Sequence, residues 1–207
     1  MDDAGLIALA RRGDAVAFSR LFSGFERPIF RYAAHMCGRD AADDIVQETF
    51  LALLRPSTSP GTGGGFDPNK GTVGNYLFGI ARHFVLKRLS AKDLATYALD
   101  EDDLSAKASA KADEQPSVLE NLSRAETVHA VRAAIATLPA PYREAIVLCE
   151  LQELSYADAA TVAQCPVGTI RSRLHRAKEL LMTKLAAMQP GPAEAGHYAG
   201  ARLRKTV

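Results

Sequence analysis

Four cationic side chains lie within eight positions of QCPVGTIRSRLHRAKELL, residues 164–181: Arg171, Arg173, Arg176 and Lys178. Guanidinium and ammonium groups bind phosphate oxygens, and a bidentate Arg is the commonest reader of guanine edges in duplex DNA. From Cys165 to Lys184, five cationic residues accompany the single acid Glu179. This local excess of positive charge predicts a nucleic-acid surface rather than an ordinary solvated helix face.

Two other groups of residues could carry chemistry, and both patterns are weak. The stretch GGGFDPNKGT has the order Lys70, Gly71, Thr72 instead of the Gly-Lys-Thr of a phosphate-binding loop, and no strand precedes it. His35 and Cys37 could begin a metal site, but no second pair follows at ligand spacing. We therefore expect no enzyme activity, no bound metal and no cofactor.

The cationic residues are expected to lie on the second helix of a helix-turn-helix. Val167, Ile170 and Leu174 fall in one narrow sector of a helical wheel, so one face is buried. Pro166 suits the first helical turn, and Ser155 can cap the preceding helix, YADAATVAQ. Because the turn between the two helices is short, the second helix can enter a major groove. Its polar face and edges would carry Gly168, Thr169, Arg171, Ser172, Arg173, His175, Arg176 and Lys178.

The rest of the chain is also patterned as helices. Its 207 residues are 47% apolar, enough to bury a core, and the net charge of +1 excludes a polybasic nucleic-acid coat. Apolar residues recur at helical spacing and strand-like alternation is absent, which predicts an all-α protein. Charges interrupt every apolar run before roughly 18 residues, and the N-terminus lacks a signal-peptide pattern. We expect a cytoplasmic protein without membrane insertion.

Two small helical domains are predicted, at residues 1–90 and 125–188. The first would contain a helix ending at Gly38, a second helix capped by Asp40 and running to about Leu54, and a third from about Thr72 to Ser90. Between the domains, residues 91–124 are predicted to form a flexible acidic linker, and residues 189–207 a disordered tail.

The helix after Thr72 has a second candidate binding face. Arg82, Lys87 and Arg88 are unopposed by any acid there, and Tyr76 and Phe78 flank the same face. Residues expected to point away from the core are Asn75, Gly79, Arg82, His83 and Leu86. Cations beside aromatic rings suit a single strand, because phosphates meet charge and unstacked bases meet rings.

Three quoted segments together resemble a known family. LPAPYREAIVLCELQELSYADAATVAQCPVGTIRSRLHRAKELL resembles the domain with which bacterial RNA polymerase sigma factors of the extracytoplasmic-function (ECF) type read the promoter -35 element. AFSRLFSGFERPIFRYAAHMCGRDAADDIVQETFLALLR is similar to the family's -10 domain, and FDPNKGTVGNYLFGIARHFVLKRL to its strand-opening segment. The resemblance spans about residues 15–185 except the linker, and it implies a subunit that directs core RNA polymerase to promoters.

The resemblance also implies roles for individual residues. Asp44, Gln47 and Glu48 match positions that dock on the polymerase clamp helices. The unpaired -10 strand would contact Asn75, Tyr76, Arg82, His83 and Lys87, and the -35 duplex would contact Thr169, Arg171, Ser172, Arg173, His175, Arg176 and Lys178. The family usually has Trp at the position of Tyr76 and often Asn at that of His83. An anti-sigma factor is a further implied partner, and the linker would enter polymerase channels built for nucleic acid.

A regulator that acts without polymerase is the alternative from the residues alone. Such a protein would use the same helix-turn-helix, commonly as a dimer that reads two half-sites. The first domain would then be a sensor or a dimerisation module, although its pattern does not suggest a sensor. Dependence of initiation on core polymerase distinguishes the two interpretations.

Overall fold

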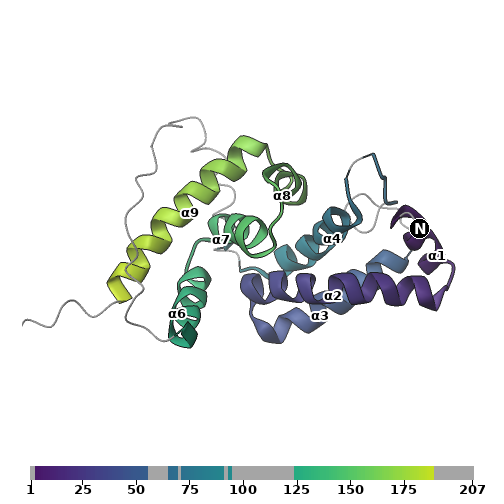
Figure 1. Ribbon diagram of the computed structural model, residues 1–207, viewed down its shortest axis with the longest axis horizontal. Helices are drawn as coiled ribbons and strands as arrows, with labels where there is room; N and C mark the ends of the chain where they lie inside the picture. The colour runs from purple at the N-terminus through teal and green to yellow at the C-terminus, as the bar shows by residue number, and fades with distance from the viewer. Residues whose placement is uncertain (1–2, 56–64, 70, 91–92, 95–123, 189–207) are drawn as a thin grey trace, which may run out of the picture.

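The computed structural model describes residues 3–55, 65–69, 71–90, 93–94 and 124–188. Every regular element in these residues is helical, as predicted, and the helices form two domains (Figure 1). The predicted linker apart from residues 93–94 and 124, most of the predicted loop after Arg55, and the C-terminal tail lie outside the described residues.

The first domain comprises α1 (Asp3–Arg11), α2 (Ala15–Cys37), α3 (Arg39–Leu54) and α4 (Val73–Arg88). The long helix α2 lies at its centre and packs against the other three helices (Figure 1). Ile29, Tyr32 and Ala33 on α2 are completely buried, because their spacing places them on one helical face. The helix continues through Pro28 without a break in its assignment.

Local capping explains where these helices begin and end. Asp14 caps α2 by accepting hydrogen bonds from the N–H groups of Val16 and Ala17, each at 2.9 Å. Gly38, with a φ of 90°, separates α2 from α3. The prediction that Asp40 caps α3 is wrong: the helix starts one residue earlier, with no side-chain cap, and Asp40 lies in the first turn. In the first turn, the negative charge of Asp40 still interacts favourably with the positive end of the helix dipole.

Helix α1 is not among the helices expected from the sequence. Its nine residues are too few for a stable isolated helix, so local pattern alone is a weak signal. Packing against α2 and α3 provides the stability, with Ile7 and Ala10 buried. Arg11 also donates from Nε to the Leu53 carbonyl at 2.8 Å, which ties the end of α1 to the end of α3.

The second domain comprises α6 (Arg124–Ala136), α7 (Ala140–Ile146), a π-helical segment (Val147–Leu151), α8 (Tyr156–Ala163) and α9 (Val167–Met188). Ser155 caps α8 as predicted, accepting from the Asp158 N–H at 3.1 Å and donating to its carboxylate at 2.6 Å. Gln164 adopts the left-handed conformation and ends α8. Only three residues separate α8 from α9, which gives the predicted helix-turn-helix.

The two domains pack directly against each other. Helix α4 lies against α8, while α2 contacts α6 and α7 (Figure 1). One cluster of buried apolar side chains includes residues of both domains, among them Ile29, Leu77, Ile146 and Leu148. The face of α4 that was expected to point away from the core is therefore partly covered by the second domain.

The close packing of α4 on α2 involves Gly74. A Cβ atom at Gly74 would lie 3.2 Å from the Cε1 atom of the Phe25 ring on α2. That separation is tighter than ordinary van der Waals contact, so α2 and α4 reach their spacing at this point because position 74 has no side chain.

Candidate nucleic-acid interface

Helix α9 presents a continuous polar and cationic face to solvent. Its buried side consists of Ile170, Leu174 and Ala177, which pack toward α7 and α8. Five of the seven residues predicted for the -35 duplex are exposed on the opposite side: Arg171, Ser172, His175, Arg176 and Lys178. A helix-turn-helix with this exposed second helix has the geometry needed to enter a major groove.

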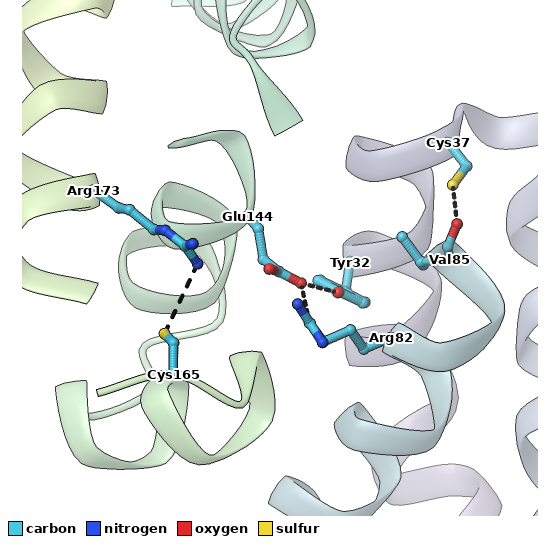
Figure 2. Close-up of polar contacts among 7 residues, drawn as sticks. All are labelled: Tyr32, Cys37, Arg82, Val85, Glu144, Cys165 and Arg173. Carbon is cyan, nitrogen blue, oxygen red and sulfur yellow. Dashed lines mark hydrogen bonds and ion pairs between the residues drawn. The ribbon is translucent and has the colours of Figure 1, made fainter. Parts of the chain in front are cut away.

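Two residues predicted to contact the -35 duplex lie inside the domain instead. Thr169 is 6% exposed and Arg173 is 3% exposed, so neither is on the reading face or its edges. The two residues and Ala177 are spaced by four positions and share one edge of the helix, which packs inward. Arg173 points from α9 toward Cys165, with its Nη1 atom 3.8 Å from the Cys165 sulfur (Figure 2). The prediction that Arg173 lies on an exposed edge of the helix, where it could bind a phosphate, is therefore wrong.

A substitution separates these two roles of Arg173. We expect Arg173→Ala to lower the unfolding free energy by roughly 1–3 kcal/mol, because it removes a buried side chain from the packing of α9. The matched change Arg171→Ala, at an exposed position, should alter stability by no more than about 0.5 kcal/mol. Thermal unfolding followed by circular dichroism measures both. Unchanged stability of the Arg173→Ala variant would contradict the buried position of Arg173 and would restore it as a candidate DNA contact.

Acidic neighbours tune the charge of the exposed α9 face. Glu179 lies 2.9 Å from the Arg176 guanidinium and 3.4 Å from His175 Nε2. Lys178 is 2.8 Å from Glu150, and this hydrogen bond is the main reason why the pKa of Lys178 is raised. Because these pairs are exposed, each is worth at most about 1 kcal/mol, and a phosphate can replace the carboxylate.

Arg171 is held by an aromatic ring instead. Its guanidinium carbon lies 5.9 Å from the centre of the Tyr156 ring, at the start of α8. Tyr156 is itself 43% exposed. This contact links the first helix of the helix-turn-helix to the polar face of the second.

Three of the five residues predicted for the -10 strand remain accessible on α4. Lys87 is exposed, while Tyr76 and His83 are half-buried. The Tyr76 hydroxyl accepts a hydrogen bond from Arg11 at 3.1 Å. Burial raises the pKa of Tyr76, and this effect outweighs the opposing charge of Arg11. Burial, and then the charge of Lys87, lowers the pKa of His83, which therefore favours the neutral imidazole. Its buried Nε2 atom has no hydrogen-bond partner.

The other two predicted -10 residues are covered by the second domain. Asn75 is 6% exposed and donates to the Asp158 carboxylate on α8. Arg82 is 9% exposed and donates from Nε to Glu144 Oε1 on α7 at 2.9 Å. Figure 2 shows this Glu144 oxygen also accepting from the Tyr32 hydroxyl of α2, at 2.8 Å. The expectation that both residues face away from the core is wrong for the packed pair of domains, because both side chains bond to acids of the second domain.

The predicted polymerase-docking residues form an accessible acidic face on α3. Asp44 and Gln47 are exposed and Glu48 is partly exposed. From the end of α4, Arg88 reaches this face, 2.6 Å from the Glu48 carboxylate and 3.9 Å from that of Asp44. The three predicted residues thus lie together, one turn apart, with an arginine at their border.

Glu144, Asp158 and Tyr32 are the contact residues that sequence reasoning missed. Glu144 directly precedes the apolar run AIVLC, residues 145–149, and this is the one signal that could have indicated a buried, paired carboxylate. Asp158 lies in the first turn of α8, where an acid is common, so no local pattern indicated its contact with Asn75. Tyr32 lies at helical spacing with the apolar residues of α2, and its ring packs 5.8 Å from that of Phe78, so only its hydroxyl serves the contact with Glu144.

Neither a metal-binding cluster nor a membrane-spanning helix is found in the described part of the chain. No three His, Cys, Asp or Glu side chains there are grouped to hold a metal ion. No described helix is long and apolar enough to span a bilayer. The three cysteines form no disulfide bond, and burial raises the pKa of Cys149 to about 11.

The second domain of this all-helical protein presents a cationic helix-turn-helix, and the first domain presents an acidic face on α3 and aromatic rings on α4. Together these features define the class of DNA-binding transcription proteins. Comparison with known families refines this class. Residues 21–94 match Sigma-70 region 2, and residues 129–181 match Sigma-70, region 4. The first match covers most of α2 together with α3 and α4, and the second runs from within α6 through the helix-turn-helix.

Full-length relatives agree in order and extent. The chain is 32% identical over 189 residues to the ECF RNA polymerase sigma factor SigC of Mycobacterium tuberculosis, covering 87% of this chain and 91% of the relative. It is 30% identical over 190 residues to the ECF RNA polymerase sigma-E factor of Escherichia coli K12, covering 89% and 95%. This protein belongs to the ECF sigma factors. It recognises promoters and directs transcription initiation by RNA polymerase.

Two solved structures share the fold. CnrH in complex with the cytosolic domain of CnrY has a TM-score of 0.61, 22% sequence identity, and coverage of 90% of this chain and 99% of that one. The sigma factor RpoE of Bartonella quintana, in complex with the anti-sigma factor NepR, has a TM-score of 0.52, also at 22% identity, covering 83% and 98%.

Proposed function

We propose that the two domains read two separate promoter elements, the second domain the -35 duplex and the first the melted -10 strand. The observation that carries this division is the exposed face of α9. Arg171, His175 and Arg176 lie together in solvent, on the second helix of a helix-turn-helix. Arg171, Ser172, His175 and Arg176 would contact base edges, and Lys178 would hold a phosphate.

Helix α4 is the proposed surface for the unpaired strand. Tyr76 offers a ring for stacking, next to Phe66 at 5.6 Å between ring centres, and Lys87 offers a charge for a phosphate. Asn75 and Arg82 would add a polar and a cationic donor once the second domain moves away. The tyrosine ring is smaller than the tryptophan usual in the family, but it has the same stacking face.

The acidic face of α3 is the proposed docking surface for the core enzyme. Asp44, Gln47 and Glu48 would meet cationic side chains of the polymerase, and their exposure and spacing suit one helix contacting another. In this function the protein supplies recognition, the polymerase supplies the chemistry, and both act in the cytoplasm. By analogy with the two solved complexes, an anti-sigma factor would be a further partner.

Footprinting on a mapped promoter tests the division of labour. Sequencing of transcripts after forced expression would identify start sites and their shared upstream elements. With core polymerase added, we expect the purified chain to protect the -35 duplex from DNase and to make -10 thymines reactive to permanganate. Protection of an operator by the chain alone, with no gain on adding polymerase, would favour the stand-alone regulator. Unreactive -10 thymines in an actively initiating complex would remove α4 from the proposed reading surface.

A further inference from the structure

A buried carboxylate of the second domain, Glu144, forms an ion pair with Arg82, the arginine of α4 that is predicted to bind DNA. Glu144 is 1% exposed, although it is an acid, and its Oε1 atom accepts from both Arg82 and Tyr32 of the first domain (Figure 2). A charge so deeply buried requires a paired, hydrogen-bonded partner. Here the Arg82 guanidinium, 2.9 Å away, is such a partner, and it comes from the other domain.

A second carboxylate repeats the arrangement two turns away along α4. Asp158, at the start of α8, accepts a hydrogen bond from the Asn75 side-chain amide. Asn75 and Arg82 are separated by seven positions, so they lie on the same face of α4. The two acids therefore contact the two predicted -10 residues that are least exposed, and no other predicted -10 residue is below 9% exposure in the described part of the chain.

Carboxylates and phosphates compete for the same donors. Both present anionic oxygens that accept charge-assisted hydrogen bonds from guanidinium groups and bonds from amide N–H groups. Helix α8 also lies directly on α4, so a nucleotide strand could not reach Asn75 or Arg82 while the domains are packed. The packed arrangement and the bound strand exclude each other on this face.

We propose that Glu144 and Asp158 form a carboxylate latch that occupies the promoter-strand site of α4, so that domain packing and binding of single-stranded DNA are mutually exclusive. This inference rests on the proposed role of α4 in reading the -10 strand. The free chain then binds DNA with an apparent affinity reduced by the fraction of molecules that are open. Other contacts between the domains, such as Arg31 with Gln152 at 3.2 Å, hold the same arrangement without touching a predicted DNA contact.

The test compares two double variants of the full chain. Glu144→Gln with Asp158→Asn keeps side-chain size and removes both latch charges, which leaves the buried Arg82 without its counter-charge and favours opening. Glu26→Gln with Glu153→Gln is the matched control, because it removes the same number of negative charges but at exposed positions. Small-angle X-ray scattering gives the radius of gyration, and fluorescence anisotropy gives the affinity for a labelled random 20-nucleotide single strand.

We expect the latch variant to have a larger radius of gyration than the wild type and to bind the oligonucleotide at least roughly tenfold more tightly. The control variant should match the wild type in radius and gain only the small uniform increase expected from the loss of two negative charges. Excess oligonucleotide should also expand the wild-type protein. A latch variant that stays compact, or that opens but binds no better than the control, overturns the proposal.

Two further measurements keep the outcome unambiguous. If the double variant unfolds, Tyr32→Phe removes only the hydroxyl that donates to Glu144, and it should shift radius and affinity in the same direction by a smaller factor. Permanganate reactivity of the wild-type polymerase complex separates the two hypotheses. Reactive -10 thymines together with a latch variant that binds no better refute the latch alone, whereas unreactive thymines refute the proposed role of α4 on which it rests.

Discussion

Reversing two charges on α3, as Asp44→Arg with Glu48→Arg, is expected to abolish co-purification of this sigma factor with core RNA polymerase. The Asp44 and Glu48 side chains are 68% and 41% exposed, so their substitution leaves the core of the first domain intact. Like charges placed across an interface cost several kcal/mol, which corresponds to at least about a hundredfold loss of affinity. Affinity purification with tagged core enzyme, followed by run-off transcription, measures the effect.

The neighbouring Arg88 provides the control for this experiment. Arg88→Gln removes the same two ion pairs, at 2.6 Å and 3.9 Å, but leaves the acidic face of α3 intact. Because the pairs are on the surface, their loss should change stability by no more than about 1 kcal/mol. We expect this variant to bind polymerase as well as the wild type does. Retention of the charge-reversed variant on core enzyme would move the docking surface away from α3.

The second large effect is expected in sequence specificity. Replacing Arg176 by Ala should lower discrimination among -35 variants by roughly 1–3 kcal/mol at the contacted base pair, while the affinity for poorly matched sites changes little. The side chain is 59% exposed, and its one described ion pair is with Glu179, so the substitution does not disturb the fold. Binding of the polymerase complex to a panel of promoters with single base changes measures the discrimination.

Lys178 provides the contrasting substitution. Lys178→Ala should weaken binding to every promoter in the panel by a similar factor and reduce the salt dependence by about one phosphate contact. Lys178 must give up its ion pair with Glu150, at 2.8 Å, before it can bind a phosphate. The loss of DNA affinity in Lys178→Ala should therefore be smaller than for a lysine without such a partner. Equal losses across the panel for Arg176→Ala would remove Arg176 from the base-reading residues.

Local sequence signals predicted most of the helices and several of their ends, although they missed α1 and gave α3 the wrong cap. The serine before YADAATVAQ and the threonine at 72 both cap helices through bonds to a backbone N–H three residues later. Gly38 ends α2, and alanines 159, 160 and 163 are buried where α8 meets its neighbours. These features depend on a few adjacent residues, so periodicity and capping chemistry suffice to predict them.

Burial by distant segments accounts for most of the errors. The apolar stripe of α9 was centred correctly on Ile170 and Leu174, but its width was not, because only the packing against α7 and α8 shows that Arg173 lies inside it. In the same way, Asn75 and Arg82 are polar residues on the outer face of one domain. Their burial comes from another domain, and no local pattern in α4 encodes it.

The missing side chain at Gly74 separates two kinds of change in this protein. The distance between α4 and α2 is limited by the contact at Gly74, where the Cβ atom of any other residue would lie 3.2 Å from the Phe25 ring. The polar residues Asn75 and Arg82 of α4 bond instead to Asp158 and Glu144 of the second domain, so substitutions there act on the contact between the domains rather than on the spacing of α2 and α4. A substitution at Gly74 would therefore disturb the first domain itself, whereas a substitution at Asn75 or Arg82 would disturb the joining of the two domains.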